Sequence, residues 1–334
     1  MILELLDQEH AVVWQEVEAR IADVAWPTIG HRIEPHHLST ARHDLLSSGL
    51  IAEQAAVSRG GREITVVVPT VPRRATAIAR AAQRKRLLLA RYLGRAQGTP
   101  SRHGVIGPAA ERAAHASLLA AAPYGYRLLR PDGRGVVEIL GTTLTGPLDN
   151  AAIYTAMNDD GSPGGSVAIP IEVKNVRDWL YPSSPEPYQL LEKAAHITRS
   201  RPDVAVMPVL VCRRAHYTLF RMAKDLGFFV IDTYRQFILP TVSEDEVAEL
   251  RRELGFLDLV REVGADDRIV KRLTDTLPGY ALTRSERWAA TVASPLAAEF
   301  TSMRAAHDAT IRHNELEVIR QLAERDLAGA ELGW

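Results

Sequence analysis

The first 70 residues combine helical and strand-like patterns of apolar positions. Apolar side chains at helical spacing predict one helix over residues 9–24. A second helix is predicted from Pro35, which suits a helix start, to Gly49, which suits a helix end. Two strand-like stretches then flank residues 59–62, and the second of them reads EITVVVP, so we expect a β-hairpin.

Further along, residues 75–98 predict one long helix, and strands and helices then alternate from residue 104 to residue 240. The expected strands are two short ones within YRLLRPDGRGVVEILG, followed by LDNAAIYTA, VAIPIEVKN, VAVMPVLVC and FFVID. The helices are expected over residues 111–122, in YQLLEKAAHITRS and in AHYTLFRMAKDLG. This alternation predicts an α/β layered fold. Residues 241–334 have helical patterns throughout, so the expected segments are 1–72, 73–103, 104–240 and 241–334.

Composition adds a few limits to this picture. The chain has 334 residues, which is enough for two or three domains. It contains one cysteine, Cys212, which excludes an internal disulfide framework and a cysteine zinc cluster. The beginning MILELLDQEH does not resemble a signal peptide, and no apolar run approaches the length of a membrane span. We therefore expect a cytoplasmic protein without a membrane partner.

Charge is distributed unevenly along the chain, although the net charge is only −1. Residues 64–110 contain no acidic side chain and nine basic ones, whereas residues 241–334 contain 18 acidic and 12 basic ones. A basic segment of this kind is typical of a polyanion-binding surface, but it is also typical of a solvated, arginine-rich helix. The sequence leaves these two interpretations open.

The N-terminal pattern of a helix, a Gly-Leu-Ile corner and a hairpin with a basic tip resembles a winged helix-turn-helix domain. This resemblance implies that residues 36–48 form the recognition helix and that the hairpin tip reaches the DNA backbone or minor groove. The expected DNA contacts, including those of the basic helix, are His36, His37, Thr40, Arg42, Arg59, Arg62, Arg84, Lys85 and Arg86. Winged helices also dock proteins, so a protein partner stays open.

Two charged residues interrupt the apolar strand IPIEVKN. Glu172 and Lys174 are two residues apart, so both side chains should point to the same face of the strand. One interpretation is an ion pair on an edge strand, which contributes little to stability. The other is a functional site, since unpaired charges are costly to bury.

The residues around this strand resemble the PD-(D/E)xK nuclease superfamily, which has the restriction-endonuclease-like fold. The matching positions are Pro147 and Asp149 before the preceding strand and then the tripeptide Glu172, Val173 and Lys174. Further matches are Glu111 on the helix before the first strand and Gln189 on the helix after the last of these positions. The resemblance covers residues 104–240 and implies a central mixed sheet flanked by helices.

The resemblance also implies a reaction and a metal ion. Asp149, Glu172, Lys174 and Gln189 would be the catalytic residues of a DNA endonuclease. Asp149, Glu172, the Val173 carbonyl and Glu111 would bind Mg²⁺, for which Mn²⁺ is expected to substitute. Lys174 would orient the attacking water. Restriction, phage defence and DNA repair all suit such an enzyme.

Two alternatives of other classes stay open. One is a non-catalytic DNA-binding regulator or defence adaptor, in which the nuclease-like domain serves as a scaffold. The other is a protein-interaction module built from the N-terminal domain and the acidic C-terminal helices. Those helices are also the expected surface for a homodimer.

Overall fold

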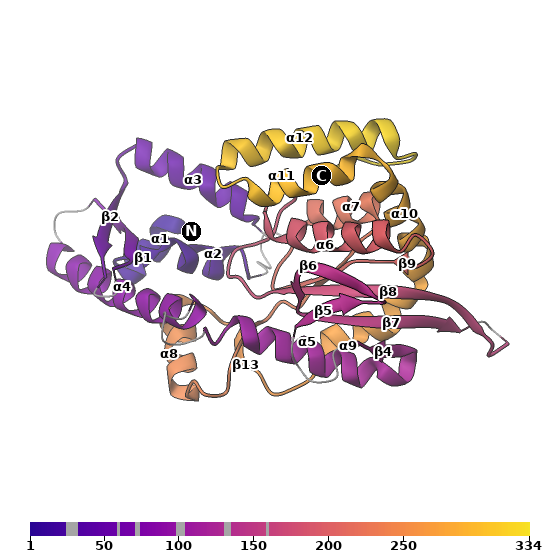
Figure 1. Ribbon diagram of the computed structural model, residues 1–334. Helices are drawn as coiled ribbons and strands as arrows, with labels where there is room; N and C mark the ends of the chain where they lie inside the picture. Colours follow the sequence, from indigo (N-terminus) through magenta and orange to yellow (C-terminus); the bar gives the residue numbers. More distant parts are fainter. Residues whose placement is uncertain (25–32, 59–60, 71–73, 98–103, 130–134, 158–159) are drawn as a thin grey trace. The chain divides into compact units, whose positions relative to one another are not determined.

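The computed structural model describes residues 1–24, 33–58, 61–70, 74–97, 104–129, 135–157 and 160–334 (Figure 1). The chain forms two compact units, and neither is continuous in sequence. Unit 1 contains Met1–Ile106 and Ile238–Arg261, and unit 2 contains Gly107–Phe237 and Glu262–Trp334. These boundaries differ from the expected ones, because the first part of the acidic C-terminal region belongs with the N-terminal helices.

Unit 1 is built from helices around a small antiparallel sheet with the strand order β1-β3-β2. Its elements are α1 (Ile2–Glu9), β1 (Val12–Val13), α2 (Trp14–Ile21), α3 (Pro35–Ser47), β2 (Ile51–Val57), β3 (Glu63–Pro69), α4 (Ala75–Gln97), α8 (Glu244–Leu254) and β13 (Leu259–Arg261). The last strand before α8, β12 (Gln236–Ile238), spans the boundary between the units. The predicted second helix, hairpin and basic helix correspond to α3, β2–β3 and α4.

The prediction of a single helix over residues 9–24 was wrong. Helix α1 ends at Glu9, because the backbone of the next residue, His10, is left-handed with φ of 61°. Val12 and Val13 then pair with Val67 and Val66 of β3, and α2 begins only after them. The valines are fully buried, so pairing with the sheet outweighs their helical spacing.

Helix α8 completes the apolar core of unit 1. Val247, Leu250 and Leu254 of α8 are buried in the same cluster as Leu88 and Leu89 of α4. Residues 238–261 therefore return to the N-terminal unit, and the region 241–334 is not a separate helical domain.

Unit 2 is a mixed α/β layer. Its elements up to the return of the chain are α5 (Gly107–Ala121), β4 (Tyr126–Leu128), β5 (Val136–Ile139), β6 (Thr142–Leu148), β7 (Asn150–Met157), β8 (Pro163–Lys174), α6 (Glu186–Ser200), β9 (Ala205–Val206), β10 (Val209–Cys212), α7 (Tyr217–Leu226) and β11 (Phe229–Asp232). The C-terminal part adds α9 (Asp267–Lys271), α10 (Ala281–Ala293), α11 (Glu299–Ala305) and α12 (Ala309–Asp326).

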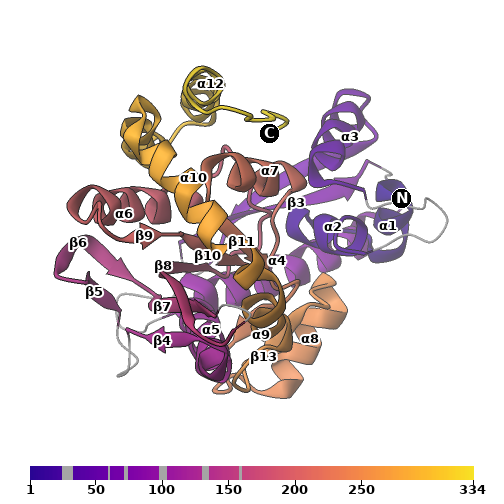
Figure 2. The same ribbon diagram turned by 90° about the vertical axis from the view of Figure 1, so that its right-hand side faces the viewer.

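The main sheet of unit 2 has the order β11-β10-β8-β7-β4, with β9 paired to β8. Strands β8, β10 and β11 are parallel, whereas β7 runs antiparallel to β8 and to β4. Helices α6, α7 and α10 cover one face and α5 lies on the other (Figure 2). The expected mixed sheet flanked by helices is confirmed at this level.

Two predicted strand segments differ in detail from the structure. VAVMPVLVC is not continuous, because β9 ends at Val206 and β10 begins at Val209, and each pairs with a different part of β8. The two short strands expected around residues 132–133 are β4 and β5, but they belong to different sheets: β4 pairs with β7 and β5 with β6. Residues 130–134 lie outside the described part of the chain.

Helices α10 to α12 pack onto the α6 side of unit 2. Trp288, Phe300 and Ile319 are fully buried in its main core cluster. The chain end is also held there, because the indole N–H of Trp334 donates to a carboxylate oxygen of Asp225 at 2.7 Å. These helices thus form part of the domain core, and dimerisation through them stays a prediction.

Candidate functional site

The site predicted from the sequence forms where β7 begins and β8 ends. Asn150 pairs with Ile171 in the antiparallel ladder, so Asp149, just before β7, lies at the level of Glu172. Ala168 belongs to the core cluster on the α6 side, and alternation along β8 therefore directs Glu172 and Lys174 towards α6. The interpretation as an edge-strand ion pair fails for Glu172, since β8 lies between β7 and β10 and Glu172 is only 4% exposed.

Each carboxylate oxygen of Glu172 accepts a hydrogen bond from a different ammonium group. Lys174 Nζ lies 2.8 Å from Oε1, and Lys193 Nζ lies 2.9 Å from Oε2. Lys174 also donates to Gln189 Oε1 at 2.8 Å. Buried charges require such partners, so Glu172 is held firmly by two cations.

Lys193 is a site residue that the sequence reasoning missed. It follows Gln189 by four residues, which places both on one face of α6. Lys193 is buried, and its ammonium group also donates to the Pro147 carbonyl at 2.6 Å, just before Asp149. The spacing from Gln189 was the only signal in the sequence, and a lysine at this spacing is usually solvated.

Asp149 carries the most perturbed carboxyl group of this site. One oxygen accepts the backbone N–H of Val173 at 2.7 Å. Burial, followed by repulsion from Glu172, raises the pKa of Asp149 to about 7, and Glu111 contributes further repulsion. Lys174 and the Val173 hydrogen bond oppose this rise. Perturbed carboxyl groups of this kind cluster at functional sites.

The structure thus brings Asp149, Glu172, Lys174 and Gln189 together, and Glu111 of α5 is near enough to act on Asp149. One turn beyond Glu111, His115 Nδ1 lies 2.9 Å from the side-chain oxygen of Asn150. This contact fixes the first residue of β7 against α5.

Asn175, which follows Lys174, has a structural role. Its amide group donates to the Phe237 carbonyl at 2.7 Å and accepts the Phe237 backbone N–H at 3.1 Å. Asn175 therefore mimics a strand partner for the segment after β11. Cys212 of β10 is buried, and burial raises the pKa of its thiol, as expected for an inert core cysteine.

Most of the expected DNA contacts lie on α3 and the β2–β3 hairpin. His36, His37 and Thr40 are exposed on α3. Arg42 is engaged instead, since its Nε donates to Glu53 at 2.6 Å and its guanidinium lies 4.8 Å from the Trp14 ring centroid. Arg62 is half-buried beside the hairpin tip, and Arg59 lies outside the described residues.

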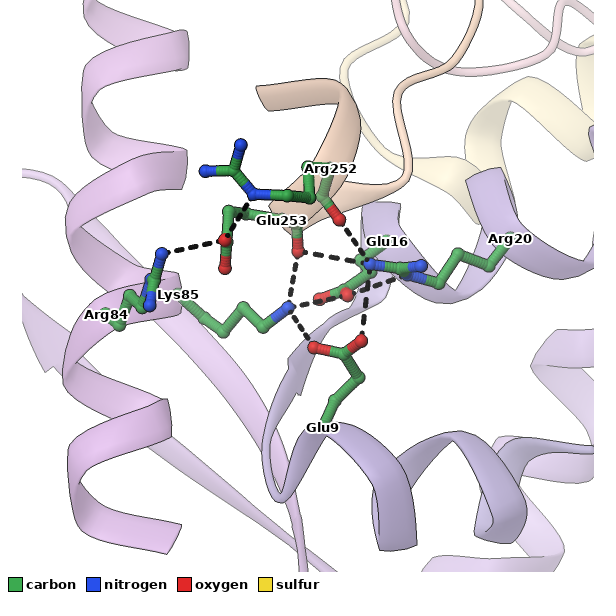
Figure 3. A network of polar contacts seen from close by, with 7 residues as sticks. All are labelled: Glu9, Glu16, Arg20, Arg84, Lys85, Arg252 and Glu253. Carbon is green, nitrogen blue, oxygen red and sulfur yellow. Dashed lines mark hydrogen bonds and ion pairs between the residues drawn. The ribbon is translucent and has the colours of Figure 1, made fainter. Parts of the chain in front are cut away.

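The prediction that Lys85 contacts DNA was wrong. Lys85 is 2% exposed, and its ammonium group lies 2.7 Å from Glu16, 2.9 Å from Glu9 and in hydrogen-bond contact with the Glu253 carbonyl (Figure 3). Arg20 joins the same network through Glu16 at 2.9 Å. Lys85 therefore links α1, α2, α4 and α8 inside unit 1.

The rest of the basic helix α4 is largely matched by acidic residues of α8. Arg84 pairs with Glu253 at 2.7 Å and Arg91 with Glu249 at 3.2 Å. Arg95 pairs with Glu246, which is the third acidic residue of α8 to pair with an arginine of α4. Arg86 donates to the Gln54 carbonyl at 3.1 Å. The uneven charge along the sequence is thus compensated within unit 1.

No family model, no curated protein and no solved structure matches the chain. Among the described residues, none of the helices is long and apolar enough to cross a membrane.

Proposed function

We propose that the chain is a metal-dependent DNA endonuclease whose active site is formed by Asp149, Glu172, Lys174 and Gln189. One observation carries the proposal: a carboxylate, a second carboxylate and a lysine meet at the adjoining ends of two paired strands, with a glutamine 2.8 Å from the lysine. The order of elements also supports the proposed restriction-endonuclease-like fold, since α5 precedes the β4-β7-β8 part of the sheet and α6 follows β8.

The donor set suits a hard divalent cation. Asp149, Glu172 and Glu111 offer carboxylate oxygens, and the Val173 carbonyl adds a neutral oxygen, which are the ligands that Mg²⁺ and Mn²⁺ prefer. The raised pKa of Asp149 is consistent with this, because burial is its main cause and repulsion from Glu172 and Glu111 adds to it. When bound, the metal would polarise a phosphate oxygen and lower the pKa of a coordinated water.

The chain's own side chains take the remaining roles. Lys174 is held between Glu172 and Gln189, so its ammonium group can donate a hydrogen bond to the attacking water or to a phosphate oxygen without further ordering. Gln189 positions Lys174. Glu172 holds both ammonium groups at the site by accepting a hydrogen bond from each.

The DNA surface of unit 1 is proposed to be α3 with the β2–β3 hairpin, in a winged-helix arrangement. The sheet order β1-β3-β2 and the exposed residues His36, His37 and Thr40 support this surface. The proposed DNA surface does not include the basic helix α4, because three of its arginines pair with acidic residues of α8.

A second candidate is a DNA-binding scaffold without catalysis. It is favoured by Glu172, both of whose oxygens already have ammonium partners, so this set of side chains is stable without a metal. In that case DNA binding would survive substitution of Lys174, and there would be no cleavage to lose.

The test is metal-dependent cleavage of supercoiled, linear, single-stranded and branched DNA. Mg²⁺ and Mn²⁺ would be compared with EDTA, and the protein with its Lys174→Ala variant. Lys224→Ala is the matched control, since Lys224 also pairs with a carboxylate but lies outside the site. We expect cleavage by the wild type and the control, and none by Lys174→Ala. Intact DNA in every reaction, with duplex binding preserved, would favour the scaffold.

A further inference from the structure

Lys193 occupies an unusual place for a residue beside a metal site. Its buried ammonium group lies 2.9 Å from Glu172 and 2.6 Å from the Pro147 carbonyl, so it bridges β8 and the segment that leads to Asp149. A cation bound by Asp149 and Glu172 would share the Glu172 carboxylate with this ammonium group. Lys193 therefore both holds the site together and repels the ion that the site would bind.

The charges of the site show how this repulsion is balanced. Asp149, Glu172 and Glu111 carry three negative charges when ionised, and Lys174 and Lys193 carry two positive ones. One divalent cation would change the net charge from −1 to +1, and one phosphodiester would then return it to zero. Without Lys193 the net charge would be −2, and the divalent cation alone would neutralise it.

We propose that Lys193 is a positioning residue that opposes metal binding in the free protein, so that the divalent cation binds tightly only together with a phosphodiester. The proposal rests on the metal site of the proposed function. The opposition is strong because Lys193 is buried, where charges are screened less than on the surface. Lys174 opposes metal binding less, since its side chain is 17% exposed and its charge is therefore better screened than that of Lys193, which is 7% exposed.

The test is Mn²⁺ binding without DNA, measured from the electron paramagnetic resonance signal of free Mn²⁺. Lys193→Met removes the charge and keeps most of the side-chain length, Lys193→Arg keeps the charge, and Lys224→Met is the control outside the site. We expect Lys193→Met to bind Mn²⁺ at least tenfold more tightly than the wild type, and the other two variants to bind within threefold of it. Lys193→Gln serves if Lys193→Met does not fold by circular dichroism.

A second arm adds a short duplex with phosphorothioate linkages, which supplies phosphodiester charge and resists cleavage. It should tighten Mn²⁺ binding by the wild type at least tenfold and by Lys193→Met much less. Equal or weaker Mn²⁺ binding by Lys193→Met would overturn the role of Lys193 and leave the proposed metal site standing. Binding that survives Asp149→Asn in the Lys193→Met background, or no Mn²⁺ binding by any variant, would overturn the metal site and with it this proposal.

Discussion

Glu172 and Lys85 are both buried charged residues, but their surroundings indicate different roles. Both are nearly inaccessible and both bind more than one partner of opposite charge. Glu172 lies beside Asp149, whose pKa is perturbed, and this combination suggests chemistry. Lys85 of α4 is surrounded by partners from three other helices and links all four. The sequence predicted Glu172 as a site residue and Lys85 as a DNA contact. The second prediction failed because nothing in the local sequence shows that a lysine within a basic run is buried.

At residue scale, the raised pKa of Asp149 predicts a pH-dependent stability. The folded protein keeps the proton up to about pH 7, whereas the unfolded chain loses it near 3.8. Unfolding between these values releases a proton, so the free energy of unfolding should fall as the pH rises from about 4 to 7, by on the order of 4 kcal/mol at most. Asp149→Asn should remove this slope. Urea unfolding of the wild type and of Asp149→Asn across this pH range measures the free energy of unfolding. The same dependence on pH in both proteins would contradict the prediction.

Lys85 should matter for stability and not for DNA binding. Lys85→Met leaves Glu16 buried without its main cation, and burial already raises the pKa of that carboxyl. We expect the free energy of unfolding at pH 7 to fall by about 3–5 kcal/mol. The loss should be smaller at pH 5, because a protonated Glu16 needs no cation. Lys224→Met, which breaks an exposed pair with Glu331, should change the free energy of unfolding far less. A similar small loss for Lys85→Met would show that the network is not a structural link.

At the scale of elements, local patterns predicted α3 to α7 and the strands β2, β3, β7, β8, β10 and β11, because period and turn residues agreed there. They failed where a distant partner decides the structure. Val12 and Val13 leave the helix because β3 offers them hydrogen bonds, and β9 separates from β10 because the two pair with different parts of β8. For the candidate site, Asp149, Glu172 and Lys174 were predicted from two paired strands and Gln189 from the family resemblance, whereas Lys193 is brought to these residues by the packing of α6.

The pairing of α4 with α8 makes a prediction about DNA affinity. A double variant, Glu246→Gln with Glu249→Gln, removes the partners of Arg95 and Arg91 and leaves the apolar contacts of α8 in place. We expect a loss of about 1 kcal/mol or less per pair in the free energy of unfolding. Duplex affinity should rise at low salt, and log affinity should depend more steeply on log salt, by about 0.9 per freed arginine that reaches phosphate. Fluorescence anisotropy over a salt series measures this. An unchanged slope would show that α4 faces away from DNA even when uncovered.

At the scale of the whole molecule, unit 1 should not fold from its N-terminal part alone. A fragment of residues 1–106 lacks the buried side chains that residues 238–261 supply, which are Ile238, Val242, Val247, Leu250, Leu254, Phe256 and Leu259. It also lacks the Glu253 carbonyl that Lys85 contacts. We expect this fragment to show weak, non-cooperative thermal unfolding. A version with residues 238–261 attached through a flexible linker should unfold cooperatively. Cooperative unfolding of the short fragment would contradict the prediction.

Because unit 1 is discontinuous in sequence, its core cannot be completed during translation until residues 238–261 have been synthesised. α4 ends at Gln97 and α8 at Leu254. At typical rates of synthesis, α8 therefore leaves the ribosomal exit tunnel on the order of ten seconds after α4. In this interval the side of α4 that later packs on α8 lacks its apolar partners, and Arg84, Arg91 and Arg95 lack their acidic ones. We expect nucleic acid or a chaperone to be able to bind this side of the nascent chain until then. Once α8 is made, it covers this side of α4. The acidic helix therefore completes the core of unit 1 and also ends the exposure of the basic side chains of α4.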